Sequence, residues 1–314
     1  MGMVSPKDFV GRDVLSILDF NREELDYIMD VADEVERNMD AYRGLLSGKT
    51  MAILFFEPST RTRLSFEAAM KKLGGLTLDM GEPTRASIEK GETLTDTIRV
   101  VQNYADLIVL RHPKEGAAKL AAEVADIPVI NGGSGAEEHP TQAMLDLYTI
   151  RRCKKRIDGL RIGILGDLKY GRTTHSLAYA LSNYDVKLYL VSPELLRMRR
   201  EVLRHISGRI EVQELESIDQ VLPELDVLYV TRIQKERFVD ESEYLKVKGS
   251  YRVTIDTLSK MKKDAIIMHP LPRVDEIAIE VDSTPNAVYF KQVYYGLLTR
   301  MSIISLVLGA LSGK

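Results

Sequence analysis

Hydroxyl and guanidinium side chains crowd the turn at residues 56–63, which reads Phe-Glu-Pro-Ser-Thr-Arg-Thr-Arg. The turn follows an apolar run typical of a buried parallel strand and precedes an amphipathic segment that predicts a helix. Free backbone N–H groups and the helix dipole favour an anion there, and arginine adds bidentate hydrogen bonds. Ordinary helix capping is the common alternative, but it needs only one hydroxyl. The number of donors favours phosphate over carboxylate.

A second turn of similar design, Gly-Asp-Leu-Lys-Tyr-Gly-Arg at 166–172, follows the apolar run 160–165. An arginine at one strand end is usually solvated. Several together need an anionic ligand, because the carboxyl ends of parallel strands converge on one side of a sheet. The arginines expected at strand ends are Arg61, Arg111, Arg172 and Arg232.

Strand and helix patterns alternate along the chain, which predicts parallel sheets with crossover helices. The expected strands are 51–56, 76–79, 106–111 and 128–131 in the first half, and 160–165, 186–191, 210–213, 226–230 and 265–268 in the second. Helices are expected at 194–205, across 141–155 between the halves, and at the apolar C-terminal segment. We therefore expect an α/β fold of two doubly wound parallel-sheet domains joined by a long helix, with a C-terminal helix returning to the first domain.

Composition limits the class of protein. The 314 residues carry a net charge of −3, from 43 basic and 46 acidic residues, which argues against nucleic-acid and membrane-surface binding. The single cysteine, Cys153, excludes an internal disulfide framework and a cysteine-cluster metal site. The N-terminus lacks the apolar core of a signal peptide, and the apolar run 303–311 is shorter than the ~20 residues of a membrane span. We expect a cytoplasmic protein.

Three motifs resemble the transcarbamylase family: the turn 56–63, His-Pro-Thr-Gln at 139–142, and His-Pro-Leu-Pro at 269–272. The third motif, together with 166–172 and Thr-Arg-Ile-Gln at 231–234, resembles the aspartate branch of that family. The ornithine branch carries cysteine where this chain has Pro270, and a Ser-Met-Gly stretch that this chain lacks. The match covers essentially the whole chain, and the motifs keep their order.

The resemblance implies transfer of the carbamoyl group of carbamoyl phosphate to the amine of L-aspartate. The products would be N-carbamoyl-L-aspartate and phosphate, in de novo pyrimidine biosynthesis. It implies a carbamoyl-phosphate-binding domain at 1–140 with the C-terminal helix 292–314, and an aspartate-binding domain at 141–291. No metal or other cofactor is expected. The family forms homotrimers with shared active sites, and some members also bind zinc-containing regulatory chains, a partner that the sequence leaves open.

The resemblance also implies roles for single residues. Arg111, His139 and Thr62 would contact the carbonyl oxygen, where charge grows during the reaction. The residues implied in catalysis are Arg61, Thr62, Arg111 and His139. The residues implied to bind carbamoyl phosphate are Ser59, Thr60, Arg61, Thr62, Ser87, Lys90, Arg111, His139, Gln142, Pro270 and Leu271, with Ser87 and Lys90 coming from a neighbouring subunit. Those implied to bind aspartate are Lys90, Arg172, Arg232, Gln234 and Leu271.

Two further expectations concern charges near the first turn. The resemblance implies that Glu57 bridges to Arg172 and Arg237 when the domains close, whereas an ordinary surface pair is the alternative. Arg61 is expected on the phosphate and Arg63 in packing or salt bridges around the turn. The leaving phosphate could take the amine proton, so a dedicated side-chain base is not required.

Other interpretations stay open. Residues 163–167 invite a nucleotide-binding Rossmann unit, but the G-x-G-x-x-G spacing is absent and no acidic residue ends the strand 186–191. A non-catalytic homologue that binds phosphate ligands is a second alternative, and a transcarbamylase for another amine is a third. His139 alone would more often be a helix-entry residue than a catalytic one.

Overall fold

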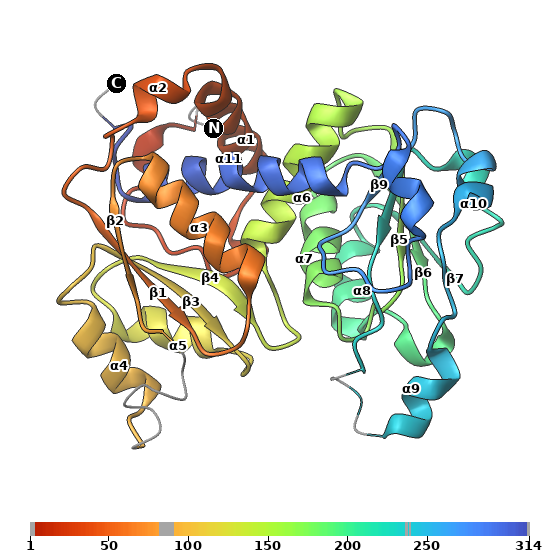
Figure 1. Ribbon diagram of the computed structural model, residues 1–314, viewed down its shortest axis with the longest axis horizontal. Helices are drawn as coiled ribbons and strands as arrows, with labels where there is room; N and C mark the ends of the chain where they lie inside the picture. The colour runs from red at the N-terminus through yellow and green to blue at the C-terminus, as the bar shows by residue number, and fades with distance from the viewer. Residues whose placement is uncertain (1–3, 82–90, 236–237, 239, 313–314) are drawn as a thin grey trace. The chain divides into compact units, whose positions relative to one another are not determined.

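The computed structural model describes residues 4–81, 91–235, 238 and 240–312 (Figure 1). By contact, the chain divides into two compact units. Unit 1 comprises Met1–Leu145 and Tyr294–Lys314, and unit 2 comprises Asp146–Val293. Each unit contains one parallel sheet, of four and five strands respectively, so the predicted α/β fold with two parallel sheets is confirmed.

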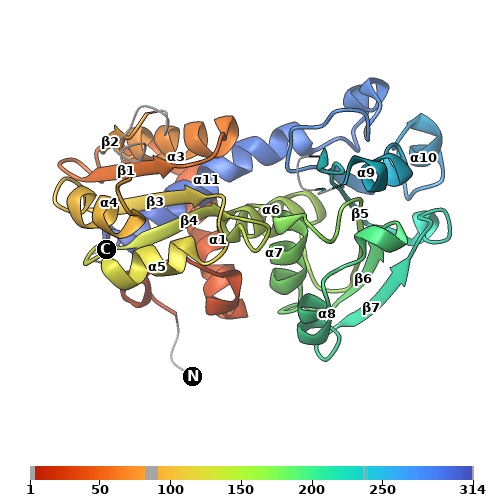
Figure 2. The same ribbon diagram turned by 90° about the horizontal axis from the view of Figure 1, so that it is seen from below.

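Unit 1 is built on a sheet with strand order β2-β1-β3-β4. The strands are β1 (Thr50–Phe55), β2 (Leu76–Asp79), β3 (Leu107–His112) and β4 (Val129–Ser134). The helices are α1 (Arg22–Arg37), α2 (Met39–Tyr42), α3 (Thr60–Lys72), α4 (Leu94–Val101) and α5 (Ala117–Val124). Figures 1 and 2 show α4 and α5 on one face of this sheet and α3 on the other.

The register of the strands in unit 1 brings the carboxyl ends of β1 and β3 next to each other. Phe55, the last residue of β1, lies beside Arg111 of β3, and the Phe56 N–H donates to the Arg111 carbonyl at 2.8 Å. On one face, Ala52 and Ile108 form an apolar cluster with residues of α4 and α5. This burial on both faces explains why β1 and β3 read as continuous apolar runs. The turn after β1 therefore starts next to the end of β3.

The C-terminal helix α11 (Tyr289–Val307) contacts helices of unit 1, as predicted. The Ser302 hydroxyl donates to the Ile28 carbonyl in α1 at 2.8 Å. The Arg300 guanidinium donates to the Ser65 hydroxyl in α3 at 3.0 Å. Both α11 and α6 (Pro140–Lys154) run from one unit into the other along the chain.

Unit 2 is built on a sheet with strand order β7-β6-β5-β8-β9. The strands are β5 (Leu160–Leu165), β6 (Val186–Val191), β7 (Glu211–Leu215), β8 (Val227–Val230) and β9 (Ile266–Met268). The helices are α7 (Arg172–Leu181), α8 (Arg200–Ile206), α9 (Glu241–Val247) and α10 (Ile255–Ser259). On one face of this sheet, Leu165, Leu228 and Ile267 form an apolar cluster with residues from 218–225 and 251–289.

One predicted helix is wrong. Residues 194–205 do not form a single helix, because a 3₁₀ turn, η5 (Glu194–Leu196), precedes α8 and the chain between them is extended. The Leu196 carbonyl accepts the Leu168 N–H at 3.1 Å, so a tertiary hydrogen bond replaces the helical one. In the described part of the chain, no helix combines the length and the apolar character that crossing a membrane requires.

Candidate active site

The turn after β1 places hydroxyl and guanidinium side chains at the start of α3. Ser59 is the N-cap of α3, yet its side chain makes no capping hydrogen bond, and the first turn of the helix contains no acidic residue. The first N–H groups of a helix have no intrahelical partner. Thr60 and Arg61 are exposed, whereas Thr62 is buried. The helix start therefore offers hydroxyls, backbone N–H groups and a positive dipole end to an anion.

Thr62 lies next to His139. The Thr62 Oγ1 atom is 3.4 Å from His139 Nε2, although 77 residues separate them in sequence. His139 is buried and precedes Pro140, the first residue of α6, while its carbonyl accepts the Gln142 N–H at 3.0 Å. His139 therefore begins the helix and also places its ring next to Thr62, so its structural role does not exclude the predicted chemical one.

Arg111 is held by two groups of unit 1. Its Nη1 donates to the Gly132 carbonyl at 3.2 Å, and its Nε lies 2.9 Å from Glu57 Oε1. Both side chains are largely buried, at 12% and 16% exposure. No local sequence pattern predicts this ion pair. Arg237, one of the expected partners of Glu57, lies outside the described residues.

The two arginines of the first turn have different surroundings. Arg63 Nε forms an ion pair with Asp79 Oδ2 of β2 at 2.6 Å. Arg61 has an exposed side chain. Arg63 therefore lies in a salt bridge beside the turn, as predicted, while the position of Arg61 suits contact with a ligand.

In unit 2, the turn between β5 and α7 is closed around a carboxylate. Asp167 is fully buried and accepts backbone N–H groups from Lys169 at 3.2 Å, Tyr170 at 2.9 Å and Gln234 at 3.5 Å. Burial raises the pKa of Asp167 to about 6, although these hydrogen bonds and Arg232 act in the opposite direction. Asp167 is not among the site residues predicted from the sequence. The sequence signal that could have identified it is a carboxylate directly after a predicted strand, in a turn whose backbone N–H groups need an acceptor.

Asp167 connects, through hydrogen bonds, the two segments that carry the expected aspartate-binding residues. Arg172 begins α7, and Arg232 and Gln234 follow β8, the neighbour of β5. The Gln234 side-chain amide donates to the Tyr170 carbonyl at 3.3 Å. Gly166 has φ +127, and a Cβ there would lie 2.2 Å from the Thr231 carbonyl oxygen, so only glycine permits this approach.

The segment 269–272 presents carbonyl groups. His269 Nδ1 accepts the Leu271 N–H at 2.8 Å, so Nε2 carries the ring proton and donates to Glu276 Oε1 at 2.7 Å. Leu271 has φ +55. Because the Leu271 N–H is committed and Pro270 has none, the free backbone groups here are acceptors, which suits an amine donor. Glu276 supports this segment and is not among the residues predicted from the sequence.

Each unit thus gathers part of the predicted set. The predicted residues that lie in unit 1 are Ser59, Thr60, Arg61, Thr62, Arg111, His139 and Gln142. Those that lie in unit 2 are Arg172, Arg232, Gln234, Pro270 and Leu271. Ser87 and Lys90 lie outside the described residues.

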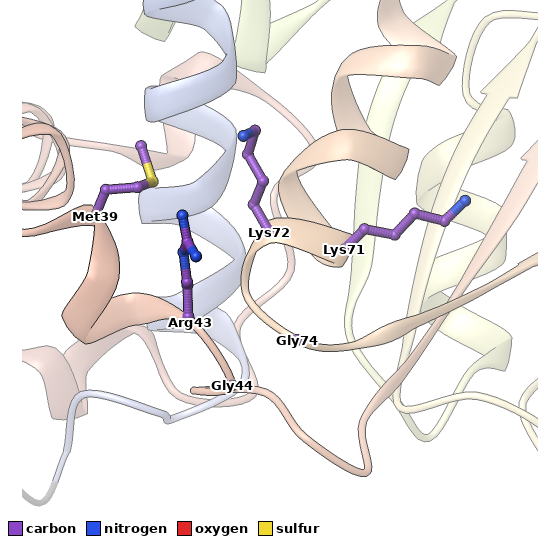
Figure 3. A pocket seen from close by; sticks show the side chains of 6 residues that line it. All are labelled: Met39, Arg43, Gly44, Lys71, Lys72 and Gly74. Carbon is purple, nitrogen blue, oxygen red and sulfur yellow. The ribbon is translucent and has the colours of Figure 1, made fainter.

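A separate cavity of about 330 Å³ lies at the ends of α2 and α3 (Figure 3). Its lining residues are Met39, Arg43, Gly44, Lys71, Lys72 and Gly74. Two of its cations are paired, Arg43 with Asp40 at 3.0 Å and Lys71 with Glu67 at 2.5 Å. The cavity contains none of the predicted site residues. Over the described ranges, no group of three or more His, Cys, Asp or Glu side chains is placed to hold a metal ion.

Two models of known protein families match this chain, one over most of each unit. Residues 12–152 match the carbamoyl-P binding domain of aspartate/ornithine carbamoyltransferase, and residues 158–307 match the Asp/Orn binding domain.

Individual relatives agree over nearly the whole chain. The aspartate carbamoyltransferase catalytic subunit of Thermococcus onnurineus is 56% identical, covering 98% of this chain and 100% of the relative. The catalytic subunit of M. jannaschii aspartate transcarbamoylase has a TM-score of 0.87 at 50% identity, covering 96% of this chain and 100% of that one. The Trypanosoma cruzi aspartate transcarbamoylase in complex with carbamoyl phosphate and aspartate has a TM-score of 0.93 at 38% identity, covering 98% and 100%.

Proposed function

Because this chain belongs to the aspartate/ornithine carbamoyltransferase family, we propose that it is an aspartate carbamoyltransferase. It transfers the carbamoyl group of carbamoyl phosphate to the amine of L-aspartate and releases phosphate. The observation that carries this proposal is the full-length identity to aspartate-specific catalytic subunits, in a chain that keeps Thr62, His139 and Arg111 at one sheet edge. Unit 1 binds carbamoyl phosphate and unit 2 binds aspartate.

The helix start of α3 holds the phosphate group. Ser59, Thr60 and Thr62 supply hydroxyls, and the uncapped N-terminal N–H groups point at the anion. Arg61 adds a bidentate guanidinium contact. These donors stabilise the negative charge that gathers on the phosphate as the carbamoyl–oxygen bond breaks.

The carbonyl oxygen of the carbamoyl group is the second place where charge grows. Arg111, His139 and Thr62 stabilise that oxygen, and Gln142 lies near the carbamoyl nitrogen. Arg111 is aligned by the Gly132 carbonyl and by Glu57, so its guanidinium needs little reorganisation during the reaction. Such preorganised donors are usually the largest single contribution to acyl-transfer catalysis.

Unit 2 positions the nucleophile. Arg172 and Arg232 pair with the two carboxylates of aspartate, and Gln234 adds a side-chain amide. The Pro270 and Leu271 carbonyls accept hydrogen bonds from the attacking amine and so orient its lone pair. Holding both reactants removes much of the entropic cost of their encounter. The released phosphate takes the amine proton, so no side chain has to act as base.

The assembly and location extend the proposal. Ser87 and Lys90 of a neighbouring subunit complete the carbamoyl-phosphate site in a homotrimer, and Lys90 also reaches aspartate. A zinc-containing regulatory chain is a further candidate partner, and the location is cytoplasmic. The product, N-carbamoyl-L-aspartate, feeds pyrimidine biosynthesis.

A colorimetric assay for carbamoyl-amino acid tests the reaction. Carbamoyl phosphate is held fixed while aspartate, ornithine and other amino acids are compared. We expect product with aspartate and none above background with ornithine. Equal or greater turnover of another amine would contradict the assignment, and no turnover of any amine would favour the non-catalytic alternative.

A further inference from the structure

An N-terminal segment before α1 extends the sheet of unit 1. Val14 pairs with Ile130 in a parallel bridge beside β4. The Val14 N–H donates to the Val129 carbonyl, and the Asn131 N–H donates to the Val14 carbonyl, both at 2.9 Å. Asp13 Oδ1 accepts the Val129 N–H at 2.7 Å. Residues 13–17, which we call the strap, thus run along the free edge of β4.

The strap also holds the chain between β4 and α6. Glu138 is buried, at 7% exposure, and immediately precedes His139. One of its carboxylate oxygens accepts the Ser16 hydroxyl at 2.5 Å, and the other accepts the Ile17 N–H at 3.0 Å. A buried carboxylate is costly unless it is hydrogen-bonded, so these two donors fix the position of the Glu138 side chain.

The same strap braces the carbonyl that holds Arg111. The Asn131 side-chain amide donates to the Leu15 carbonyl at 2.9 Å, and Asn131 Oδ1 accepts the Gly133 N–H at 2.8 Å. Gly132 lies between these two anchored residues, and its carbonyl accepts from Arg111 Nη1. The orientation of that carbonyl is therefore set from both sides.

We propose that the strap positions two groups of the carbamoyl-phosphate site, His139 through Glu138 and Arg111 through Gly132. Glu138 is a positioning residue, because it acts through its neighbour and contacts the strap. This inference rests on the proposed function, which gives His139 and Arg111 their task. Neither the sequence motifs nor the family comparison assigns a role to residues 13–17.

The charge of Glu138 supports this role. Burial raises the pKa of Glu138 to about 7, and the nearby carboxylates of Glu137 and Asp19 act in the same direction. The hydrogen bonds from Ser16 and Ile17 oppose that shift. A proton on Glu138 removes one acceptor site, so the hold of the strap on this segment weakens as pH falls through the neutral range.

The chain offers a matched pair of serines for the test. Ser5 and Ser16 are both half-buried N-caps of 3₁₀ turns, η1 (Pro6–Phe9) and η2 (Ile17–Asp19), and each forms a capping box with an aspartate. The Ser5 hydroxyl donates to Asp8 within its own turn, whereas the Ser16 hydroxyl donates to Glu138. Ser5→Ala removes a hydroxyl that bonds only within its own turn, and Ser16→Ala removes both the local bond from the Leu18 N–H at 3.1 Å and the contact with Glu138. Only Ser16→Ala therefore removes a contact of the strap with the site.

The full-length wild type and both variants are compared by steady-state kinetics and by hydrogen exchange. Ser16→Ala should lower kcat/KM for carbamoyl phosphate about 10-fold, because small displacements of catalytic groups are costly. It should also speed amide exchange in residues 131–139, while Ser5→Ala changes neither. Equal effects of the two variants, or no effect of Ser16→Ala, would overturn the strap. An inactive wild type would instead overturn the proposed function, and the exchange result would still report on the strap.

Glu138→Gln provides a second test that is independent of Ser16. The variant keeps the shape but has the acceptor count of the protonated acid. Its kcat/KM for carbamoyl phosphate should be about 10-fold below wild type at pH 8, and the two should converge towards pH 6, where the wild-type carboxyl takes up a proton. A ratio that stays constant over this range would contradict a positioning role, since a purely structural loss does not follow the titration of Glu138.

Discussion

The two strand-to-helix turns of this protein look alike in sequence and differ in what they do with their donors. The turn between β1 and α3 has an N-cap serine that makes no capping bond and has no acid in the first helical turn. The turn between β5 and α7 wraps its backbone N–H groups around the buried carboxylate of Asp167. The first has no internal carboxylate at its helix start, whereas in the second the loop N–H groups ahead of α7 are already bound to an internal carboxylate.

This difference agrees with the proposed division of binding roles between the two turns. An open helix start binds a compact anion such as phosphate with backbone groups as well as side chains. In the turn before α7, the N–H groups of Lys169 and Tyr170 are bound to Asp167 and are not offered to a ligand. This turn serves instead as a rigid mount for Arg172, while Arg232 and Gln234 come from the neighbouring strand end. The two carboxylates of aspartate are separated by a carbon chain. Side chains from different strand ends are better placed to contact both carboxylates than a single cluster of backbone N–H groups.

The sharpest test of the open turn is Arg61→Ala against Arg63→Ala. Arg61→Ala should lower kcat/KM by about 10³-fold or more, since it removes a charge that stabilises the leaving phosphate. Arg63→Ala should lose only the half-exposed ion pair with Asp79, about 0–1 kcal/mol of stability and less than about threefold of activity. Kinetics and thermal unfolding measure both. An equal loss of activity from Arg63→Ala in a folded protein would contradict the division between the two arginines.

The closed turn is tested by Asp167→Ala. Removal of the carboxylate leaves buried N–H groups without a partner and releases the Gln234 segment, so KM for aspartate should rise about 10²-fold. KM for carbamoyl phosphate should stay within about twofold of wild type if binding at unit 1 is independent. Asp158→Ala is the matched control, because Asp158 accepts the Asp185 N–H at 2.8 Å and precedes β5 instead of following it. If both variants raise KM for aspartate equally, Asp167 has no special role at the site.

Glu57→Gln tests which of its possible partners matters in turnover. The pair with Arg111 predicts a rise of about 3- to 10-fold in KM for carbamoyl phosphate, with a smaller effect on aspartate. Glu67→Gln, which breaks the exposed pair with Lys71 in α3, is the control and should be nearly silent. A change confined to aspartate would favour the bridge to Arg172 and Arg237 over the pair with Arg111.

The last test measures stability instead of activity and concerns the pH dependence that Asp167 contributes. Its pKa in the folded chain is about 6, above the ordinary 3.8, so the folded state binds more protons between these values. The contribution of Asp167 to stability is therefore greatest below pH 4 and falls as pH rises through 6. In Asp167→Asn this dependence is absent, so the stability of wild type relative to the variant should drop by roughly 2–3 kcal/mol between pH 4 and pH 7. Denaturant unfolding at the two pH values measures it, and an unchanged difference would contradict the raised pKa.

Most helices and strands of this fold could be predicted from the sequence, because the hydrophobic periodicity that marks them repeats within a few residues. For example, β5 and β6 have the bounds that their apolar runs predicted. The predicted helix at 194–205 was wrong because the Leu196 carbonyl bonds to Leu168, a partner that no local pattern reveals. Likewise, the arginine at the end of β3 was predicted, but its carboxylate partner was not.

The sequence by itself determined the chemistry that is available: a turn rich in hydroxyl and guanidinium donors, arginines at strand ends, and motifs in the order that the family shares. These features depend on residue type and short spacing. Only the tertiary structure decided which groups meet, because strand order and register bring distant residues together. Register places Arg111 beside the turn that carries Glu57, burial turns Asp167 into an internal anchor, and the edge of β4 receives residues 13–17. Those pairings follow from the sheet as a whole, so no single segment contains them.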